Sequence, residues 1–519
     1  MTSTRQRATI SAVLIVKDEE AVLERCLASV AWADEIVVYD TGSTDRTREI
    51  ARRFTENVVE GYWDADFGAA RNRAIRHASG QWILVLDADE VFHGSPEIVR
   101  ARLGHDGAQR HTILVENASP IALGPTSTEP SVRFFRRDVY HYRGKLHEQV
   151  VPRPGAVVTG PTLALPHARL VHHGYSVAVF EEKGKSERNL AIAERDLAAA
   201  VRAGAPARQQ ALLRANLLRS LVPAGRGDEA LAGARELVDE GLLEAPSTST
   251  LARLMSIVAH TYRDAEAFQF WTQTWADSDP TPAWAWAYRA QCAGERGNAE
   301  AALEALDRMP TVVVDAAQRT LDRRQLAAVE VWALHRTGRR RHALRVARDA
   351  AAAGFVPATP EVLTALCADR PEELRALLAS MSAAAWDSFA LLCTRTASDL
   401  GLDLLAVMLE ARPGHVTVLT CAAAMASVMS IEDAMRWSLE VRNANLPQLC
   451  PLVAIAQTVD LDPRQRAVAA AITIEAYGQQ SVLPWLEDAL ARVPGEHEAE
   501  LLRLLDEVAP GLVQPTVPA

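Results

Sequence analysis

Apolar and polar positions follow two different rhythms along this chain. Up to about residue 180, short apolar runs of the kind that form buried strands alternate with amphipathic segments at helical spacing. The apolar runs at 10–16, 35–39 and 57–60, with helical segments between them, predict a parallel sheet with right-handed crossovers. From about Leu190 the β-branched runs disappear and apolar residues recur only at helical spacing, which predicts an all-α second half.

A fourth apolar run, at 83–86, is the one around which the first half is organised. It reads as a fully buried strand, and three carboxylates follow it: Asp87, Asp89 and Glu90. Because burying three like charges is unfavourable, we expect this cluster just past the carboxyl end of the strand, where open α/β sheets bind ligands. The spacing Asp-x-Asp is suited to sharing a hard divalent cation. A solvated acidic turn is the alternative interpretation of the cluster taken alone.

Two further carboxylates favour a ligand site over a solvated acidic turn. Glu19 follows the first predicted strand and Asp40 follows the second, so acidic groups stand at the carboxyl ends of three different parallel strands. The ends of parallel strands meet at one edge of a sheet, and convergence there favours a ligand site over an accidental acidic turn.

Four motifs in order carry a resemblance to a known family. IVKDEE, VVYDTGSTDRT, WDADFGAARN and WILVLDADE resemble the cytosolic family-2 glycosyltransferases of the GT-A fold, over roughly 10–189. The resemblance implies that Glu19 and Asp40 hold the base and ribose of a nucleotide. It implies that Asp87 and Asp89 contact the ribose or sugar and a metal, Mn²⁺ or Mg²⁺, that bridges the donor diphosphate. Asp18 departs from the family, whose members often have asparagine there.

Composition narrows the remaining classes of function. The chain has 519 residues, more than one domain usually holds, and a mean hydropathy of −0.04, typical of globular proteins. With a net charge of −11, the chain lacks the excess of basic residues that binding to duplex nucleic acid requires, so we exclude that function. Six widely spaced cysteines predict buried, reduced thiols. The polar N-terminus, and the lack of any apolar run of about 18 residues, predict a cytoplasmic protein without a transmembrane segment.

Arginine and asparagine residues near position 71 are further candidates. Arg71 and Asn72 read as the opening of a helix, and an arginine at a helix start is a plausible seat for a diphosphate. The alternative is a salt bridge from Arg71 to Asp64 or Asp66 that only fixes the loop. The sequence leaves both interpretations open.

A histidine–glutamate pair is the candidate catalytic element. Runs at 112–116 and 132–135 read as strands, and basic residues then lead to His147 and Glu148. By resemblance, an HE element after an arginine–phenylalanine strand lies on the acceptor side. An inverting transfer needs a group that takes the acceptor proton, so Glu148 is the candidate base and His147 its orienter or substitute. A structural hydrogen-bonded pair is the alternative.

The segment from 170 to 189 closes the predicted catalytic domain. It resembles the end of that domain in family members with helical repeats. His173, or its neighbour His172, is a candidate metal ligand, and Lys185 and Arg188, three residues apart on a helix, are candidate phosphate contacts. A solvated surface helix is the alternative interpretation of the two basic residues.

The second half shows weak self-similarity. Helix starts at Gly227 and Gly297 lie two units of 35 residues apart, with Asp264 near the midpoint, and a period near 34 is typical of tetratricopeptide (TPR) helical hairpins. Trp271, Trp275, Trp284 and Trp286 form either the core of two packed helices, which we favour, or an aromatic binding platform. The predicted division of the chain is a disordered N-terminus at 1–8, a GT-A domain at 9–180, a connecting helix at 181–203, a TPR-like solenoid at 204–510 and a flexible tail at 511–519.

These observations predict a metal-dependent glycosyltransferase that uses a nucleotide-diphosphate sugar, UDP-sugar by preference, in an inverting displacement. Because helical solenoids most often bind peptides or proteins, the predicted acceptor is a peptide or protein side chain. A cell-envelope glycan or lipid-linked saccharide is the alternative acceptor. The alternative function is a non-catalytic scaffold that binds a nucleotide sugar and presents a protein-binding solenoid. The helical domain could also serve homo-oligomerisation.

Overall fold

The computed structural model describes residues 7–105, 107–117, 128–172, 183–396, 398–510 and 512. The chain divides into two compact units, one of residues 1–292 with 307–322 and one of residues 293–306 with 323–519. The first unit thus holds the sheet together with the first helices of the predicted repeat region. The domain boundaries drawn from the sequence stay a prediction.

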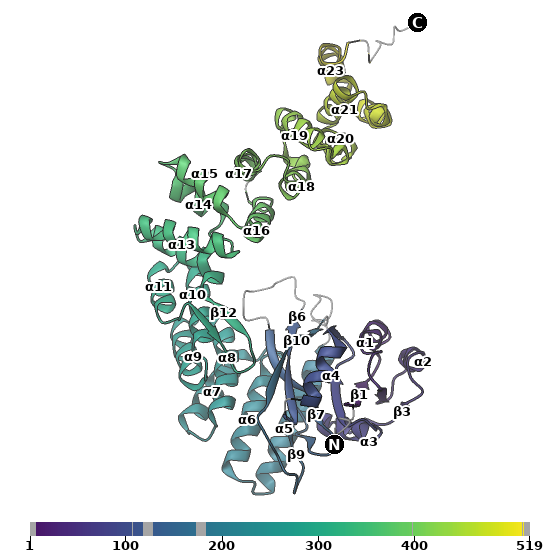
Figure 1. Ribbon diagram of the computed structural model, residues 1–519, viewed down its shortest axis with the longest axis vertical. Coiled ribbons are helices and arrows are strands. Elements are labelled where there is room, and N and C mark those ends of the chain that lie inside the picture. The colour runs from purple at the N-terminus through teal and green to yellow at the C-terminus, as the bar shows by residue number, and fades with distance from the viewer. Residues whose placement is uncertain are drawn as a thin grey trace, which may run out of the picture. The chain divides into compact units, whose positions relative to one another are not determined.

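The first unit is built on a mixed eight-stranded sheet with the order β3-β2-β1-β4-β7-β6-β10-β5 (Figure 1). Its strands are β1 (Ile10–Val16), β2 (Glu35–Asp40), β3 (Val58–Glu60), β4 (Trp82–Leu86), β5 (Glu90–Gly94), β6 (Arg110–Asn117), β7 (Thr128–Arg136) and β10 (Leu163–His172). β1 pairs in parallel with both β2 and β4, with Val13 opposite Val37 and Val85. A separate hairpin joins β8 (Tyr140–Arg143) to β9 (Gln149–Pro152). The predicted parallel core is therefore confirmed.

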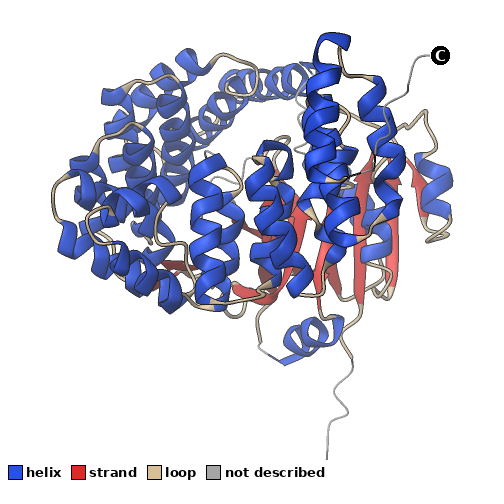
Figure 2. Cartoon of the chain, turned by 90° about the horizontal axis from the view of Figure 1, so that it is seen from above, coloured by secondary structure: helices blue, strands red, loops and turns tan. Residues whose placement is uncertain are grey.

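Both faces of the parallel strands are covered, which explains why their sequences are apolar throughout. Alternate residues of β1 point to opposite faces: Ile10, Ala12 and Leu14 belong to one buried cluster and Val13 to another. The first cluster packs against α1 (Leu23–Ser29), α2 (Thr47–Arg52) and α4 (Pro96–His105). The second packs against α3 (Phe67–Arg76) and the β8–β9 hairpin. Figure 2 shows the strands in red with helices in blue against them.

Two local expectations are wrong. α3 begins at Phe67, four residues before Arg71, because the Asp66 side chain caps it by accepting the backbone N–H of Ala69 at 2.7 Å. Arg71 is thus in the second turn of the helix and not at its start. Glu90, expected outside the core with the other carboxylates that follow the strand at 83–86, lies at the start of β5 with only 2% of its surface exposed.

The second half is all-helical except for a short hairpin. Its helices are α5 (Lys183–Arg202), α6 (Ala207–Leu221), α7 (Gly227–Asp239), α8 (Ala245–Thr261), α9 (Ala265–Ser278), α10 (Ala283–Glu295), α11 (Ala299–Asp307), α12 (Ala327–Arg336), α13 (Arg340–Ala353), α14 (Pro360–Cys367), α15 (Pro371–Ser380), α16 (Ala383–Cys393), α17 (Ser398–Ala411), α18 (Val416–Ala424), α19 (Ile431–Asn443), α20 (Pro451–Gln457), α21 (Pro463–Tyr477), α22 (Leu483–Ala491) and α23 (Gly495–Val508). The predicted helix starts near Gly227, Asp264 and Gly297 are confirmed by α7, α9 and α11. The hairpin of β11 (Val312–Val314) and β12 (Thr320–Asp322) was not predicted.

Two predictions about the core are confirmed. All six cysteines are buried, and none of them forms a disulfide. The four tryptophans at 271, 275, 284 and 286 are buried as well, with at most 7% of any of them exposed, so they form core and not a binding platform. Within the described residues, no helix has the length and apolar character needed to cross a membrane.

Candidate active site

A cavity of about 860 Å³ lies at the carboxyl ends of the parallel strands. It brings together nine of the residues predicted from the sequence: Glu19, Arg71, Asp87, Asp89, His147, Glu148, His172, Lys185 and Arg188. They come from the ends of β1, β4 and β10, from the turn before β9, and from the helices α3 and α5. Asp40 and Asn72 do not line it.

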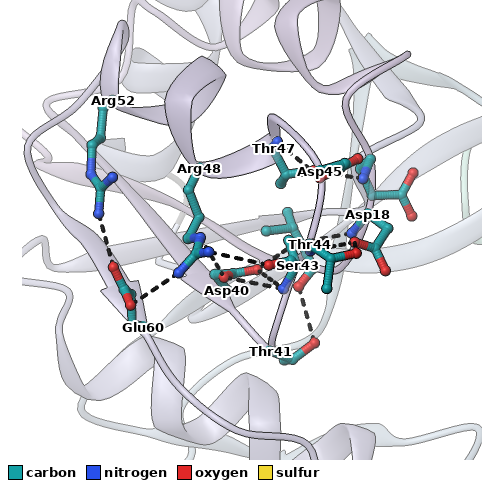
Figure 3. Close-up of polar contacts among 12 residues, drawn as sticks. Asp18, Asp40, Thr41, Ser43, Thr44, Asp45, Thr47, Arg48, Arg52 and Glu60 are labelled. Carbon is teal, nitrogen blue, oxygen red and sulfur yellow. Dashed lines mark hydrogen bonds and ion pairs between the residues drawn. The ribbon is translucent and has the colours of Figure 1, made fainter.

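The wall formed by the first two strand ends is a pair of loops, residues 17–20 and 41–47, tied together by hydrogen bonds (Figure 3). The backbone N–H of Asp18 donates to Ser43 Oγ at 2.9 Å, and that of Glu19 donates to Thr47 Oγ1 at 2.7 Å. In return, Asp18 Oδ1 accepts the backbone N–H of Thr44 at 2.7 Å. Asp18 has a φ of 54°, a region that aspartate and asparagine tolerate better than most residues. The departure at position 18 thus keeps the backbone geometry.

Asp40 supports this loop pair from beneath. Its carboxylate, almost fully buried, accepts the backbone N–H of Ser43 at 3.0 Å and its hydroxyl at 2.5 Å (Figure 3). Arg48 lies 3.5 Å away on the other side. Gly42, with a φ of 113°, makes possible the tight turn that brings Ser43 back to the Asp40 carboxylate. The structure therefore places Asp40 where it fixes the loop that reaches the cavity through Thr41.

Ser43→Ala is expected to lower the free energy of unfolding by about 1–3 kcal/mol, because it leaves buried Asp40 with one donor fewer and unties Asp18. Urea denaturation followed by circular dichroism measures this change. Thr44→Val is the matched control: that side chain is exposed and only its weaker hydroxyl contact to Asp18, at 3.2 Å, is lost. A shift for Ser43→Ala no larger than that of the control would contradict the role given to Ser43.

Arg71 links the candidate base, Glu148, to the first aspartate of the Asp-x-Asp pair, Asp87. Its Nε donates to Glu148 Oε1 at 2.6 Å, and its Nη2 donates to Asp87 Oδ1 at 2.7 Å. Neither Asp64 nor Asp66 is its partner, since Asp64 pairs with Arg73. The Nε and Nη2 atoms of the Arg71 guanidinium are thus engaged by carboxylates of the site, which orients those carboxylates, whereas its Nη1 is buried without a hydrogen-bond partner among the described residues.

Two charged residues contact Asp87: Glu90, which the sequence placed in the acidic cluster, and Arg133, which the sequence interpretation missed. Arg133 Nη2 donates to Glu90 Oε1 at 2.6 Å and lies 3.5 Å from Asp87 Oδ2. Glu90 Oε2 accepts the backbone N–H of Asp87 at 2.9 Å. Burial raises the pKa of Glu90 to about 7 against the lowering effect of Arg133. Although burial acts to raise it, the pKa of Asp87 is held well below its usual range by Arg71 and Arg133.

Asp89 and His172 form the part of the cavity best suited to a cation. Asp89 Oδ2 and His172 Nε2 lie 3.0 Å apart, and both residues line the cavity. Burial acts to lower the pKa of His172, but the hydrogen bond and charge of Asp89 outweigh it and raise that pKa. A carboxylate oxygen and an imidazole nitrogen suit a divalent cation such as Mn²⁺. Asp87, in contrast, is already engaged by Arg71 and Arg133. The predicted ligand His173 lies outside the described residues.

His147 lines the cavity from a strained position. Its φ is 52°, and its Nε2 is buried with no hydrogen-bond partner in the described part of the chain. Burial, aided by the charge of Arg219 on α6, lowers the pKa of His147 to about 3. The imidazole is therefore neutral at physiological pH, so it can accept or donate a hydrogen bond but carries no charge.

The remaining candidates have separate positions. Asn72 is turned away: its amide bonds the backbone of Tyr142 twice, at 2.8 and 2.9 Å, and so joins α3 to β8. Lys185 and Arg188 reach the cavity from α5. The Arg188 guanidinium lies 5.9 Å from the ring centre of Trp63 and 5.5 Å from that of Phe67. Trp63 and Phe67, both from the motif WDADFGAARN, give the cavity an aromatic wall that had not been predicted.

The sheet and its clustered carboxylates define an α/β domain of the GT-A type, with a ligand cavity at the ends of its parallel strands. The family model described as "Glycosyl transferase family 2" matches residues 11–100, from β1 into α4. This part of the chain is thus a glycosyl transferase family 2 domain, which confirms the resemblance drawn from the four motifs.

Similar proteins share only part of their length with this chain. A TPR repeat-containing protein of Synechococcus elongatus is 35% identical over 190 residues, which are 35% of this chain and 46% of that protein. The SPbeta prophage-derived glycosyltransferase SunS of Bacillus subtilis is 27% identical over 197 residues, 36% of this chain and 44% of SunS. The structure of glucosyl-3-phosphoglycerate synthase from Mycobacterium tuberculosis with Mn²⁺ and UDP-glucose aligns at 23% identity over 27% of this chain and 61% of that one, with a TM-score of 0.21. The chain spans less than half the length of these two curated relatives.

Proposed function

We propose that this protein is a metal-dependent glycosyltransferase that takes a sugar from a nucleotide-diphosphate donor, with UDP as the preferred nucleotide. The observation that carries the proposal is one cavity that gathers Glu19 after β1, Asp87 and Asp89 after β4, and Glu148 from the turn before β9. The family 2 domain at residues 11–100 supports the same reaction class. Carboxylates gathered around one cavity are suited to a polar ligand that carries a divalent cation.

In this proposal the two tied loops, residues 17–20 and 41–47, receive the nucleoside through Glu19 and the support of Asp40. Asp89, with His172, holds the divalent cation, Mn²⁺ or Mg²⁺. When bound, the cation stabilises negative charge on a leaving nucleoside diphosphate. Lys185 and Arg188 on α5 stand on the same cavity and add positive charge toward the phosphates. Asn72 has a structural role, since its amide joins α3 to β8.

Glu148 is the proposed base of an inverting displacement. As the acceptor attacks the anomeric carbon, the bond from that carbon to the diphosphate oxygen breaks and the acceptor proton passes to Glu148. The hydrogen bond from Arg71 Nε fixes the direction of the Glu148 carboxylate. Neutral His147, the adjacent residue on the cavity, is the proposed orienter of the acceptor.

The proposed acceptor is a peptide or protein side chain, and the helical repeat region supports this choice because such arrays commonly bind extended peptides. A saccharide acceptor remains the alternative that a panel of acceptors would test. Action in the cytoplasm and homo-oligomerisation through the helical region stay predictions.

Calorimetric titration of the wild type with UDP and GDP, with and without Mn²⁺, tests the donor site. We expect UDP to bind in the presence of Mn²⁺ and Asp89→Ala to weaken that binding at least tenfold, because the variant removes the carboxylate that holds the cation. Glu97→Ala is the matched control, since Glu97 is an exposed acid on α4 away from the cavity. Tighter binding of GDP would overturn the UDP preference. If neither nucleotide binds the folded wild type, the transferase proposal is wrong.

A further inference from the structure

The strongest concentration of charge outside the cavity lies on α13 of the second unit. One side of this helix is fully buried through Ala343, Ala347 and Ala350. On the opposite side Arg341, Arg345 and Arg348 are all exposed. Residues four and three apart share one face of a helix, so these arginines form a continuous stripe along the outside of α13.

The stretch just before the helix adds two more exposed arginines to this group: Arg336, the last residue of α12, and Arg339, the residue before α13. None of the five makes an ion pair with a carboxylate in the described part of the chain. The intervening Arg340 differs, because its Nη2 donates to Glu373 at 2.8 Å and its Nε to the carbonyl oxygen of Leu366 at 3.0 Å. The paired arginine is thus structural, whereas the exposed five are not engaged by protein acids.

Unpaired positive charge of this density is unusual in a chain whose net charge is −11. Like charges one helical turn apart destabilise a helix by a few tenths of a kcal/mol per pair. Asp349 is the only acidic residue of α13 and stands at the edge of the stripe. An anionic partner would remove the repulsion that the helix itself leaves uncompensated.

We propose that the arginine stripe (Arg336, Arg339, Arg341, Arg345 and Arg348) binds an acidic, extended peptide segment, and that this segment belongs to the acceptor. Only the identification with an acceptor rests on the proposed function. Along the helix axis, Arg341 and Arg345 are separated by about 6 Å and Arg345 and Arg348 by about 4.5 Å. Alternate residues of an extended peptide are about 6.6 Å apart, so carboxylates at every second position match the stripe. Guanidinium groups also suit bidentate contacts with carboxylates.

A peptide fits this surface better than a membrane or a nucleic acid. The apolar side of α13 is buried in the helical array, so the helix cannot insert into a lipid interface. A long polyanion would extend from the stripe over a protein with 66 acidic and 55 basic residues, and the excess of negative charge would oppose its binding. A short acidic segment meets only the arginines.

The test is fluorescence anisotropy of the full chain with a labelled ten-residue peptide of alternating glutamate and serine, without any nucleotide. We expect the wild type to bind this peptide and not its lysine–serine counterpart. The triple variant Arg341→Gln, Arg345→Gln, Arg348→Gln is expected to bind at least tenfold more weakly. The matched control carries Arg263→Gln, Arg395→Gln and Arg503→Gln, which remove the same charge from scattered exposed positions. It is expected to bind like the wild type.

If the two triple variants weaken peptide binding equally, the effect is one of general charge and the proposed binding to the arginine stripe is wrong. Failure of the acidic peptide to bind the wild type would also overturn it, including the case in which single-stranded DNA or anionic vesicles bind in its place. Because the assay contains no donor, its outcome is independent of the calorimetric result for Asp89→Ala. Transfer to peptides with and without an acidic segment then tests the link to the acceptor: loss of the preference in the stripe variant supports it, and an unchanged preference overturns it.

Discussion

Arg71→Met is expected to lower the free energy of unfolding by about 3–5 kcal/mol and to reduce glycosyl transfer at least about a hundredfold. The arginine side chain is only 10% exposed and pairs with Glu148, which is 13% exposed, and with Asp87. Removing it leaves Glu148 without its cationic partner and Asp87 with only the more distant Arg133, and this loss of compensating charge destabilises the fold. It also frees Glu148 from the direction that the Arg71 Nε imposes, so the proposed base is misplaced. Urea denaturation and initial transfer rates measure the two effects.

Arg73→Met is the matched control for this result. Arg73 is on the same helix and is also 10% exposed, but it pairs with Asp64 and does not line the cavity. We expect this variant to lose stability and to retain its turnover at saturating donor. Arg71→Lys keeps the charge but cannot donate to both carboxylates from one plane, so we expect it to recover stability more than activity. If Arg71→Lys or Arg71→Met transfers sugar at the wild-type rate, Arg71 does not position the base.

Local patterns in the sequence were sufficient for the parallel core and the acidic edge of the site. The apolar runs from Ile10 and Trp82 became β1 and β4 because both faces of those strands are covered, and the charges after Leu86 had to leave the core. The expectation that these charges leave the core fails for Glu90, because its partner, Arg133, is 43 residues away on β7. The one sequence signal for Arg133 is a charged residue inside the apolar run SVRFF, and such a residue at a strand centre needs a buried counter-charge.

For Asp40 and Arg71, the sequence predicted residues near the site but not the partners of their side chains. Asp40 was identified as a ligand residue by resemblance, but its side chain is used by Ser43 three residues later, and the turn residues Thr41-Gly42 already favoured such a local bond. For Arg71, the helix cap at Asp66 was readable from the sequence, whereas the choice of Asp87 and Glu148 as partners was not. Which of several nearby carboxylates an arginine meets depends on the angle between α3 and the sheet. That angle is set by the whole core and not by local sequence.

His147→Asn is expected to flatten the acid dependence of stability. The folded pKa of His147 is lowered to about 3, whereas an unfolded histidine titrates near about 6.5. Above that upper pKa both states are neutral and the residue's contribution to stability is fully present. As the pH falls below it, only the unfolded chain takes up the proton, so the wild type loses about 1.4 kcal/mol per pH unit, or about 3 kcal/mol at pH 4.

Asparagine removes this proton uptake and tolerates the φ of 52° at position 147, so the variant tests the titration without adding backbone strain. Urea denaturation of both proteins between pH 7 and pH 4 gives the comparison, and the difference in their unfolding free energies should change steadily below pH 6.5. Carboxylates with lowered pKa values affect both proteins equally and cancel in that difference. A difference independent of pH would mean that His147 takes up its proton in the folded protein. The neutral imidazole proposed to orient the acceptor would then be charged in weak acid, and its part in the site would have to be reassigned.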